Sequence, residues 1–134
     1  MKIPKRVKYR KYHKNKIKVT SDRTSYLRHG SFGLKALEPA RISAQHIETA
    51  RQAIGRKLRP RGRMWIRAFP HLPVTSKPSE VRMGKGKGNV SLWVCTVKKG
   101  QVLYEISGLN ILKSISALKS GMSKLPLKCV IVKY

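Results

Sequence analysis

Acidic residues are scarce in this chain, and their scarcity narrows the range of functions. Only 5 Asp and Glu stand against 31 Lys and Arg in 134 residues, for a formal net charge of +26. The acids are spread along the whole chain: Asp22, Glu38, Glu48, Glu80 and Glu105. Catalysis by a pair of carboxylates would therefore need the fold to bring distant acids together. A metal-dependent nuclease with Glu80 and Glu105 as ligands is the one enzyme hypothesis left open, and we expect no enzyme.

Motifs for metal binding and redox chemistry are also lacking. Cys95 and Cys129 are the only cysteines, and each stands in an apolar run without a Cys-x-x-Cys pair. The four histidines show no His-x-x-x-His spacing of the kind that holds zinc on a helix. We therefore expect two buried, reduced thiols and no metal or other cofactor.

Long hydrophobic runs are missing as well. No apolar run approaches the ~20 residues that span a bilayer, and no segment resembles a signal peptide, so a membrane is not the expected partner. Hydrophobic residues still make up 40% of the chain, which supports a folded domain. A compact body with this charge attracts polyanions whatever their sequence. A free protein that compacts nucleic acid is one reading of that charge.

Residues 1–30 differ in composition from the rest of the chain. They hold eleven Lys and Arg and one acid, with Tyr9, Tyr12 and Tyr26 interleaved. Their apolar residues recur with neither a helical nor a strand period. We expect a basic extended arm that becomes ordered against RNA, with its charges on the backbone and its tyrosines near bases.

Two helices are predicted in the remaining domain, residues 31–134. The first begins after Ser43 as N-cap, ends before Pro60 and Gly62, and turns one apolar stripe to the core: Ala44, Ile47, Ala50, Ile54 and Leu58. The second begins after Asn110, with Gly121 marking its end. Its predicted stripe comprises Ile111, Leu112, Ile115, Leu118 and Met122.

Strand patterns occupy most of the rest of this domain. Alternation or apolar runs predict strands over 32–37, 63–69, 90–98, 102–106 and 127–132, with Lys99-Gly100 as a hairpin turn. Pro70, Pro73 and Pro78 mark a stretch that is neither regular helix nor central strand. The order of elements predicts an α+β domain, with two helices on one face of a largely antiparallel sheet.

A glycine–lysine loop, residues 77–89, is predicted to project from this domain. Its core is Val81-Arg82-Met83-Gly84-Lys85-Gly86-Lys87-Gly88. Glycines permit positive φ and close approach, and the lysines and amides between them can face anionic oxygens. The Walker A pattern is absent, because no Lys-Ser/Thr pair follows such a loop before a helix. From the loop alone, a flexible turn and a phosphate-contacting loop are equally supported.

Several motifs in order resemble the family of large-subunit ribosomal protein number sixteen. The similarity starts at Pro4-Lys5-Arg6-Val7-Lys8-Tyr9-Arg10-Lys11 and runs through Trp65-Ile66-Arg67-Ala68-Phe69-Pro70 into Val81–Gly88. It continues in Val102-Leu103-Tyr104-Glu105 and Lys124-Leu125-Pro126-Leu127-Lys128, and so covers nearly the whole chain. The second helix departs from the family pattern, since it is rich in Ser, Ile and Leu and has no acid.

The resemblance implies a position in the ribosome rather than a reaction. It implies a structural protein on large-subunit rRNA beside the aminoacyl-tRNA site, next to other ribosomal proteins, that supports subunit assembly and tRNA accommodation. The loop would then extend toward the peptidyl-transferase region. The residues expected to contact rRNA or tRNA are Lys5, Arg6, Lys8, Arg10, Lys11, His13, Lys35, Arg51, Arg56, Arg59, Arg63, Arg67, Lys77, Arg82, Met83, Gly84, Lys85, Gly86, Lys87 and Gly88.

The cellular address is a further expectation. The family pattern starts three residues after Met1, which leaves no room for a cleavable transit peptide and favours synthesis inside an organelle or a bacterium. The bias toward Lys, Ile and Ser is typical of an A+T-rich organellar genome. We expect the large subunit of a mitochondrial ribosome, with a plastid or a bacterial cytoplasm as alternatives.

Overall fold

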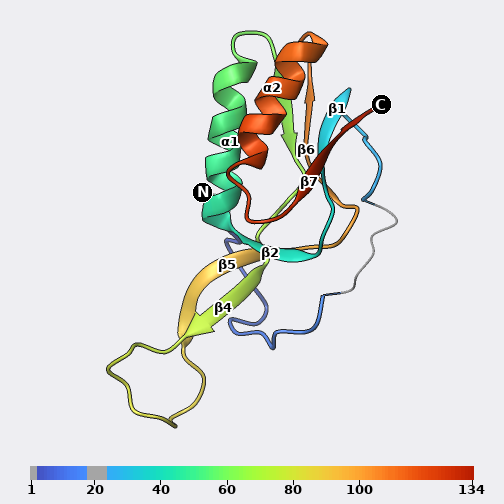
Figure 1. Ribbon diagram of the computed structural model, residues 1–134. Helices are drawn as coiled ribbons and strands as arrows, with labels where there is room; N and C mark the ends of the chain where they lie inside the picture. Colours follow the sequence, from blue (N-terminus) through green and yellow to red (C-terminus); the bar gives the residue numbers. More distant parts are fainter. Residues whose placement is uncertain (1–2, 18–23) are drawn as a thin grey trace.

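A computed structural model describes residues 3–17 and 24–134 and shows an α+β fold with its strands in two sheets (Figure 1). The larger sheet has the order β3-β6-β1-β7, and every neighbouring pair is antiparallel. Its strands are β1 (Phe32–Ala36), β3 (Arg63–Ile66), β6 (Val102–Ser107) and β7 (Cys129–Lys133). The predicted class is thus confirmed, although the strands are divided between two sheets.

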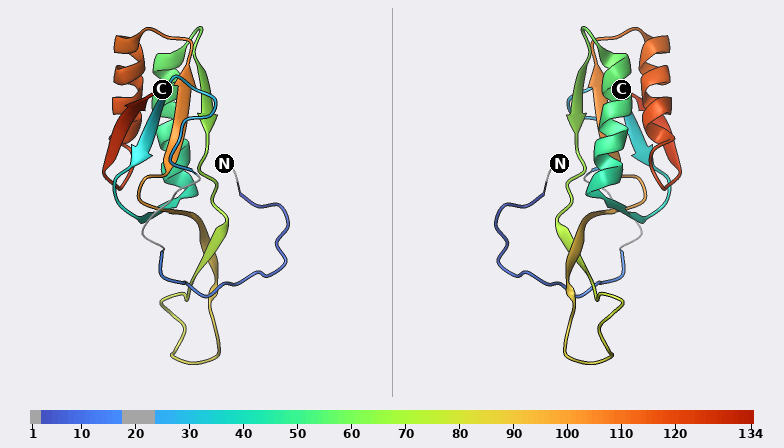
Figure 2. Two further views of the ribbon diagram at one scale, coloured as in Figure 1. Left: turned by 90° about the vertical axis from the view of Figure 1, so that its right-hand side faces the viewer. Right: turned by 90° about the vertical axis from the view of Figure 1, so that its left-hand side faces the viewer.

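Helices α1 (Ala44–Leu58) and α2 (Ile111–Met122) pack together and cover one face of the larger sheet (Figure 2). The predicted stripe of α1 is the one that is buried. Ser43 caps the helix by accepting a hydrogen bond from the His46 N–H at 3.2 Å. Tyr104 of β6 is fully buried beneath α1, where its hydroxyl donates to the Ile47 carbonyl at 2.8 Å. This hydrogen bond satisfies the one polar atom that the tyrosine brings into the core.

The prediction for α2 was confirmed for Leu118 but was wrong for Ile111, Leu112 and the end of the helix. Ile111 and Leu112 are 54% and 82% exposed, and the buried residues are Ser114, Ala117, Leu118 and Gly121. Gly121 lies inside the helix, where a Cβ would come within 2.5 Å of the Ile54 side chain on α1. The two helices approach so closely that small residues form the contact between them. The predicted stripe was chosen from large apolar side chains and therefore did not include these small residues.

The smaller sheet has the order β2-β5-β4 and extends away from the helices (Figure 1). Its strands are β2 (Ala40–Ser43), β4 (Leu72–Ser76) and β5 (Asn89–Val97). Pro73 lies within β4, which is an edge strand and therefore tolerates a residue without an N–H.

The predicted hairpin across Lys99-Gly100 was wrong, because β5 and β6 belong to different sheets. The strand predicted over 63–69 ends at Ile66, and Arg67 continues with one backbone hydrogen bond to Leu103.

Residues 24–31 lie against the face of the larger sheet that the helices leave open (Figure 2). The Val102 N–H donates to the Thr24 carbonyl at 2.9 Å, and a Cβ on Gly33 would collide with the Leu27 side chain. Residues 3–17 contain no helix or strand, whereas residues 24–30 of the predicted arm pack on the domain, and residues 1–2 and 18–23 lie outside the described part. Within the described chain, no helix is long and apolar enough to cross a membrane.

Candidate nucleic-acid interface

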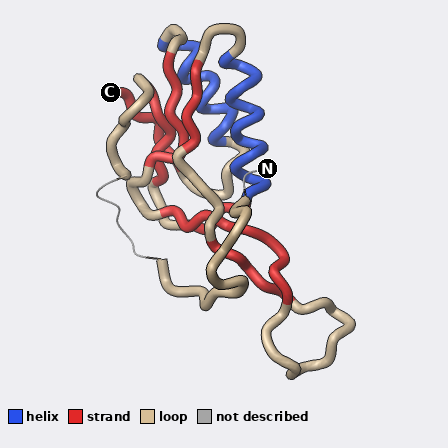
Figure 3. Tube along the Cα trace, turned by 180° about the vertical axis from the view of Figure 1, so that it is seen from behind, coloured by secondary structure: helices blue, strands red, loops and turns tan. Residues whose placement is uncertain are grey.

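The glycine–lysine loop occupies residues 77–88 between β4 and β5 and projects from the end of the smaller sheet (Figures 1 and 3). Every residue from Lys77 to Lys87 is exposed, and Met83 is 99% exposed. Arg82 and Lys85 form no hydrogen bond or ion pair with any residue that the structure describes. Their charges are therefore available to a partner outside the chain.

The glycines of the loop have two different structural roles. Gly84, Lys85 and Gly86 have φ of 95°, 55° and 82°, so three consecutive residues take the left-handed conformation that glycine adopts without steric cost. Successive N–H groups in such turns can form a concave site for anions. Gly88 serves a different purpose: a Cβ there would lie 2.3 Å from the Ser76 carbonyl oxygen, so glycine lets the two stems meet.

The arm is held against the base of this loop. Lys11 Nζ donates to the Lys87 carbonyl at 2.8 Å, and Lys87 Nζ donates to the Tyr12 carbonyl at 2.6 Å. Arg41 of β2 donates to the Asn15 carbonyl at 2.5 Å. Seen from behind, the arm crosses next to the smaller sheet (Figure 3). Segments about 75 residues apart in sequence thus form one basic surface.

The predicted contact residues of the arm and loop lie on the two segments that these hydrogen bonds join. They are exposed and come from two segments: Lys5, Arg6, Lys8, Arg10, Lys11 and His13 from the arm, and Lys77, Arg82, Met83, Gly84, Lys85, Gly86 and Lys87 from the loop, with Gly88 half-buried at its stem. Lys77 donates within the loop to the Gly84 carbonyl, so it also supports the loop's shape.

A second basic cluster lies on the outer side of α1. Arg51, Arg56 and Arg59 line a shallow hollow of about 350 Å³. Arg51 is already paired with Glu48, at 2.5–3.0 Å, and that pairing lowers the pKa of the Glu48 carboxyl. Arg56 and Arg59 are exposed, and cations near the C-terminal end of a helix are favoured by its dipole.

The remaining predicted residues are not brought together. Arg63 is exposed on the edge strand β3, whereas Lys35 is half-buried on the central strand β1. Arg67 has only 13% of its side chain exposed, because it donates to Glu105 Oε1 at 2.6 Å and to the Tyr26 carbonyl at 2.5 Å. The structure thus gives Arg67 an internal role that the alternating pattern of its strand did not indicate.

Glu105 is the centre of that internal role. Its Oε2 accepts from the N–H groups of Arg28, His29 and Gly30 at 3.0, 2.6 and 2.9 Å, and the side chain is fully buried. Burial by itself would raise the pKa of this carboxyl, but the three N–H groups and Arg67 outweigh it and lower the pKa. The nuclease hypothesis needs Glu105 as a metal ligand, but both of its carboxylate oxygens already accept hydrogen bonds within the fold.

The two thiols differ in burial. Cys95 is buried and Cys129 is half-buried, so the expectation of two buried thiols holds only for Cys95. Both are free, and burial raises the pKa of each, that of Cys129 to about 11. Neither thiol is set up as a nucleophile.

Sequence reasoning overlooked one more part of this surface. Tyr12 of the arm, His71, Leu72 of β4 and Thr96 of β5 line a hollow between the arm and the smaller sheet. Pro70, Pro73 and Pro78 argue against a helix or a central strand in this stretch, but they do not predict the edge strand β4 that forms one wall. The exposed tyrosines of the arm were the only available signal.

Comparison with known proteins assigns the chain to a family. Residues 4–132 match the family described as ribosomal protein L16p/L10e. Proteins named large ribosomal subunit protein uL16 from Sinorhizobium fredii and Rhizobium meliloti are each 53% identical over 125 residues, and that from Chelativorans sp. is 51% identical. Each alignment covers 93% of this chain and 91% of the relative. The chain, with its projecting basic loop and arm, therefore belongs to the L16p/L10e family of ribosomal proteins, which are structural and not enzymatic.

Proposed function

We propose that this protein is a structural constituent of the large ribosomal subunit and binds large-subunit rRNA through the arm, the glycine–lysine loop and the outer arginines of α1. The observation that carries the proposal is the surface formed by the arm and the loop. It is cationic, exposed and joined by reciprocal hydrogen bonds between Lys11 and Lys87 and between Lys87 and Tyr12. Phosphate contacts by such residues supply much of the affinity for RNA and fix a protein's orientation on it.

Co-sedimentation tests this proposal directly. The full chain should sediment with large subunits in moderate salt, because many contacts persist when each one is weakened. Recovery of the protein entirely off the ribosome would overturn the proposal. Retention on duplex DNA at the same salt, with no large-subunit RNA recovered, would instead favour the nucleic-acid-compacting protein.

We further propose that the loop lies beside the aminoacyl-tRNA site and supports tRNA accommodation, with other large-subunit proteins as neighbours. The support is the family relationship together with the reach and exposure of the loop tip, where Met83 is almost wholly solvent-accessible. A Met83→Cys variant carrying a short photocrosslinker should attach to tRNA bound in that site. The parent chain is a suitable control, because burial raises the pKa of both of its thiols and slows their labelling.

The outcome of crosslinking separates the finer proposal from the coarser one. Crosslinks confined to rRNA far from the bound tRNA would refute the placement beside tRNA and leave the ribosomal role intact.

We propose, finally, that the ribosome is mitochondrial. The support is compositional, namely the Lys, Ile and Ser in α2 and the absence of acids from that helix. The relatives named above come from bacteria, so their identity supports a ribosome of bacterial type without specifying the compartment. Fractionation of the source cells decides the matter: recovery in cytoplasmic ribosomes alone would refute the mitochondrial address.

A further inference from the structure

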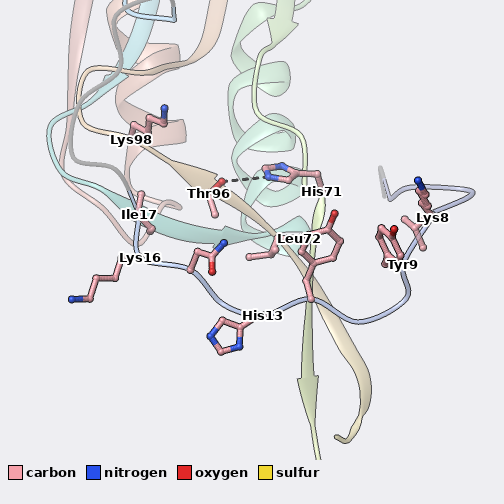
Figure 4. A pocket seen from close by; sticks show the side chains of 12 residues that line it. Lys8, Tyr9, His13, Lys16, Ile17, His71, Leu72, Thr96 and Lys98 are labelled. Carbon is pink, nitrogen blue, oxygen red and sulfur yellow. Dashed lines mark hydrogen bonds between the residues drawn. The ribbon is translucent and has the colours of Figure 1, made fainter.

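A hollow of about 490 Å³ lies between the arm and the smaller sheet (Figure 4). The arm supplies Lys8, Tyr9, Tyr12 and Asn15, and β4 and β5 with the residue preceding β4 supply His71, Leu72 and Thr96. Figure 4 shows the arm passing beneath the sheet, with His71 and Thr96 above it. The volume falls in the range of ~300–1,000 Å³ that is typical of small-molecule sites.

The arm wall is aromatic and uncovered. Tyr9 and Tyr12 are 57% and 49% exposed, although their ring centroids are 6.5 Å apart in an edge-to-face arrangement. Lys8 Nζ lies 5.6 Å from the centroid of the Tyr9 ring. Large rings that stay half-exposed on an extended segment offer a flat surface to a flat ligand.

The sheet wall places an oriented imidazole and a hydroxyl beside the apolar side chain of Leu72. His71 Nδ1 lies 3.2 Å from the Phe69 carbonyl, and Nε2 lies 3.4 Å from the Thr96 hydroxyl (Figure 4). These two contacts hold the imidazole ring in one orientation. The Thr96 hydroxyl, together with the Asn15 amide of the arm, adds donors and acceptors that can match the edge of a base.

The charge around the hollow is of one sign. Lys8, Lys16 and Lys98 line it, and none of its lining residues within 3–17 and 24–134 is an acid. A hydrophobic peptide would gain nothing from these cations, whereas a planar group flanked by phosphates fits both the rings and the charges. RNA is recognised in this way, by stacking of unpaired bases on aromatic side chains with the backbone on basic residues.

We infer that this hollow takes one unstacked base of large-subunit rRNA, stacked against the tyrosines of the arm, with its neighbouring phosphates on the lysines at the rim. The inference rests on the proposed function, since it assumes that rRNA is the partner. It adds a contact with a base to a surface whose other proposed contacts are with phosphates.

The experiment uses large-subunit particles depleted of this protein and reassembled with the full chain. Dimethyl sulfate then measures which base edges are accessible in particles that carry wild type, Tyr12→Leu or Tyr12→Phe. Tyr134→Leu is the control, because Tyr134 is 91% exposed and does not line the hollow. One nucleotide should be protected by wild type, Tyr12→Phe and Tyr134→Leu, but not by Tyr12→Leu. Loss of one stacked base should weaken binding of Tyr12→Leu to the particles by roughly 5- to 100-fold.

Three results would overturn the inference. Identical protection by wild type and Tyr12→Leu, with both bound, would show that no base occupies the hollow and would leave the ribosomal role intact. A photoreactive group at position 12 that attaches only to another ribosomal protein would make the hollow a protein contact. Failure of the wild-type chain to bind the particles would refute both this inference and the proposed function. Urea unfolding of each variant verifies that the exposed substitutions leave the fold intact.

Discussion

The two ends of this protein use their charges in opposite ways. In the helix-covered half, comprising the larger sheet with α1 and α2, the acids are paired: Glu48 with Arg51, and Glu105 with Arg67 and three N–H groups. In the basic projection, comprising the arm residues 3–17, β4, β5 and the loop, the only described acid is Glu80, which is exposed.

The difference separates folding from binding. Glu105 satisfies groups that the fold has buried, so its loss should change stability, whereas the Glu48 pair on α1 is partly exposed. Where carboxylates are missing, cations remain unneutralised and are available to a polyanion, so loss of a cation should change binding.

The largest effect is expected from Glu105→Ala. Removal of this carboxylate leaves Arg67 and the N–H groups of residues 28–30 without their acceptor, and breaking a buried pair costs about 3–5 kcal/mol. Urea titration should show this loss in the free energy of unfolding. The control Glu48→Ala removes a partly exposed pair on α1 and should cost less than about 1 kcal/mol. Equal losses in the two variants would contradict the central role of Glu105.

Acid should produce part of the same effect in the unmutated chain. The pKa of Glu105 is lowered from its ordinary value of 4.5, so the ionised form is the one that the fold stabilises. The contribution is complete above the unfolded pKa and is lost as pH falls through the folded pKa. The free energy of unfolding should therefore fall below about pH 4.5, and Glu105→Gln should lack this component of the fall. Parallel pH profiles for the two proteins would contradict the assignment.

In the projection, Arg82→Ala with Lys85→Ala should change binding and leave stability unchanged. RNA affinity falls with salt concentration, and the slope of log affinity against log salt grows with the number of phosphate contacts. If both side chains contact phosphates, that slope should become shallower by roughly 0.7–0.9 for each contact removed. Lys99→Ala is the matched control, because this exposed lysine follows β5 at the far end from the loop. An unchanged slope in the double variant would show that the loop tip carries no phosphate contact.

The smallest effects concern two helical glycines. Gly55 on α1 has open space at the position of a Cβ, so Gly55→Ala should stabilise the fold by up to about 1 kcal/mol through helix propensity. Gly121→Ala has the same gain in helix propensity, but the new methyl group collides with the Ile54 side chain. The cost of this overpacking, about 1–3 kcal/mol, should cancel or exceed the gain. Thermal unfolding of the two variants measures the difference, and a stabilised Gly121→Ala would show that Ile54 can move aside.

The sequence allowed some elements to be predicted accurately and others not at all. The start and the buried stripe of α1 were predicted to the residue and its end to within two residues, because its cap, apolar stripe and terminating proline are all local signals. Strands β1, β5 and β6 were located within a residue or two for the same reason. The stripe of α2 was misjudged because its burial depends on how closely α1 approaches at Gly121.

The candidate site shows the same limit. The exposure of the glycine–lysine loop follows from its own prolines, glycines and lysines, and was expected. Arg67 was grouped with exposed cations because nothing near it in sequence indicates a partner at position 105. The hollow was missed because β4 and the arm, which form its walls, are about 60 residues apart.

The sequence by itself determined the polyanionic partner, the family, the helix-and-strand content and the loop that carries exposed charge, because composition and short-range periodicity are properties of the chain alone. Only the tertiary structure decided the division into two sheets, the burial of Glu105 beneath residues 28–30, and the contact of the arm with the loop. Each of these depends on pairing between distant segments, where burial and hydrogen-bond geometry select one partner among many that the local pattern permits.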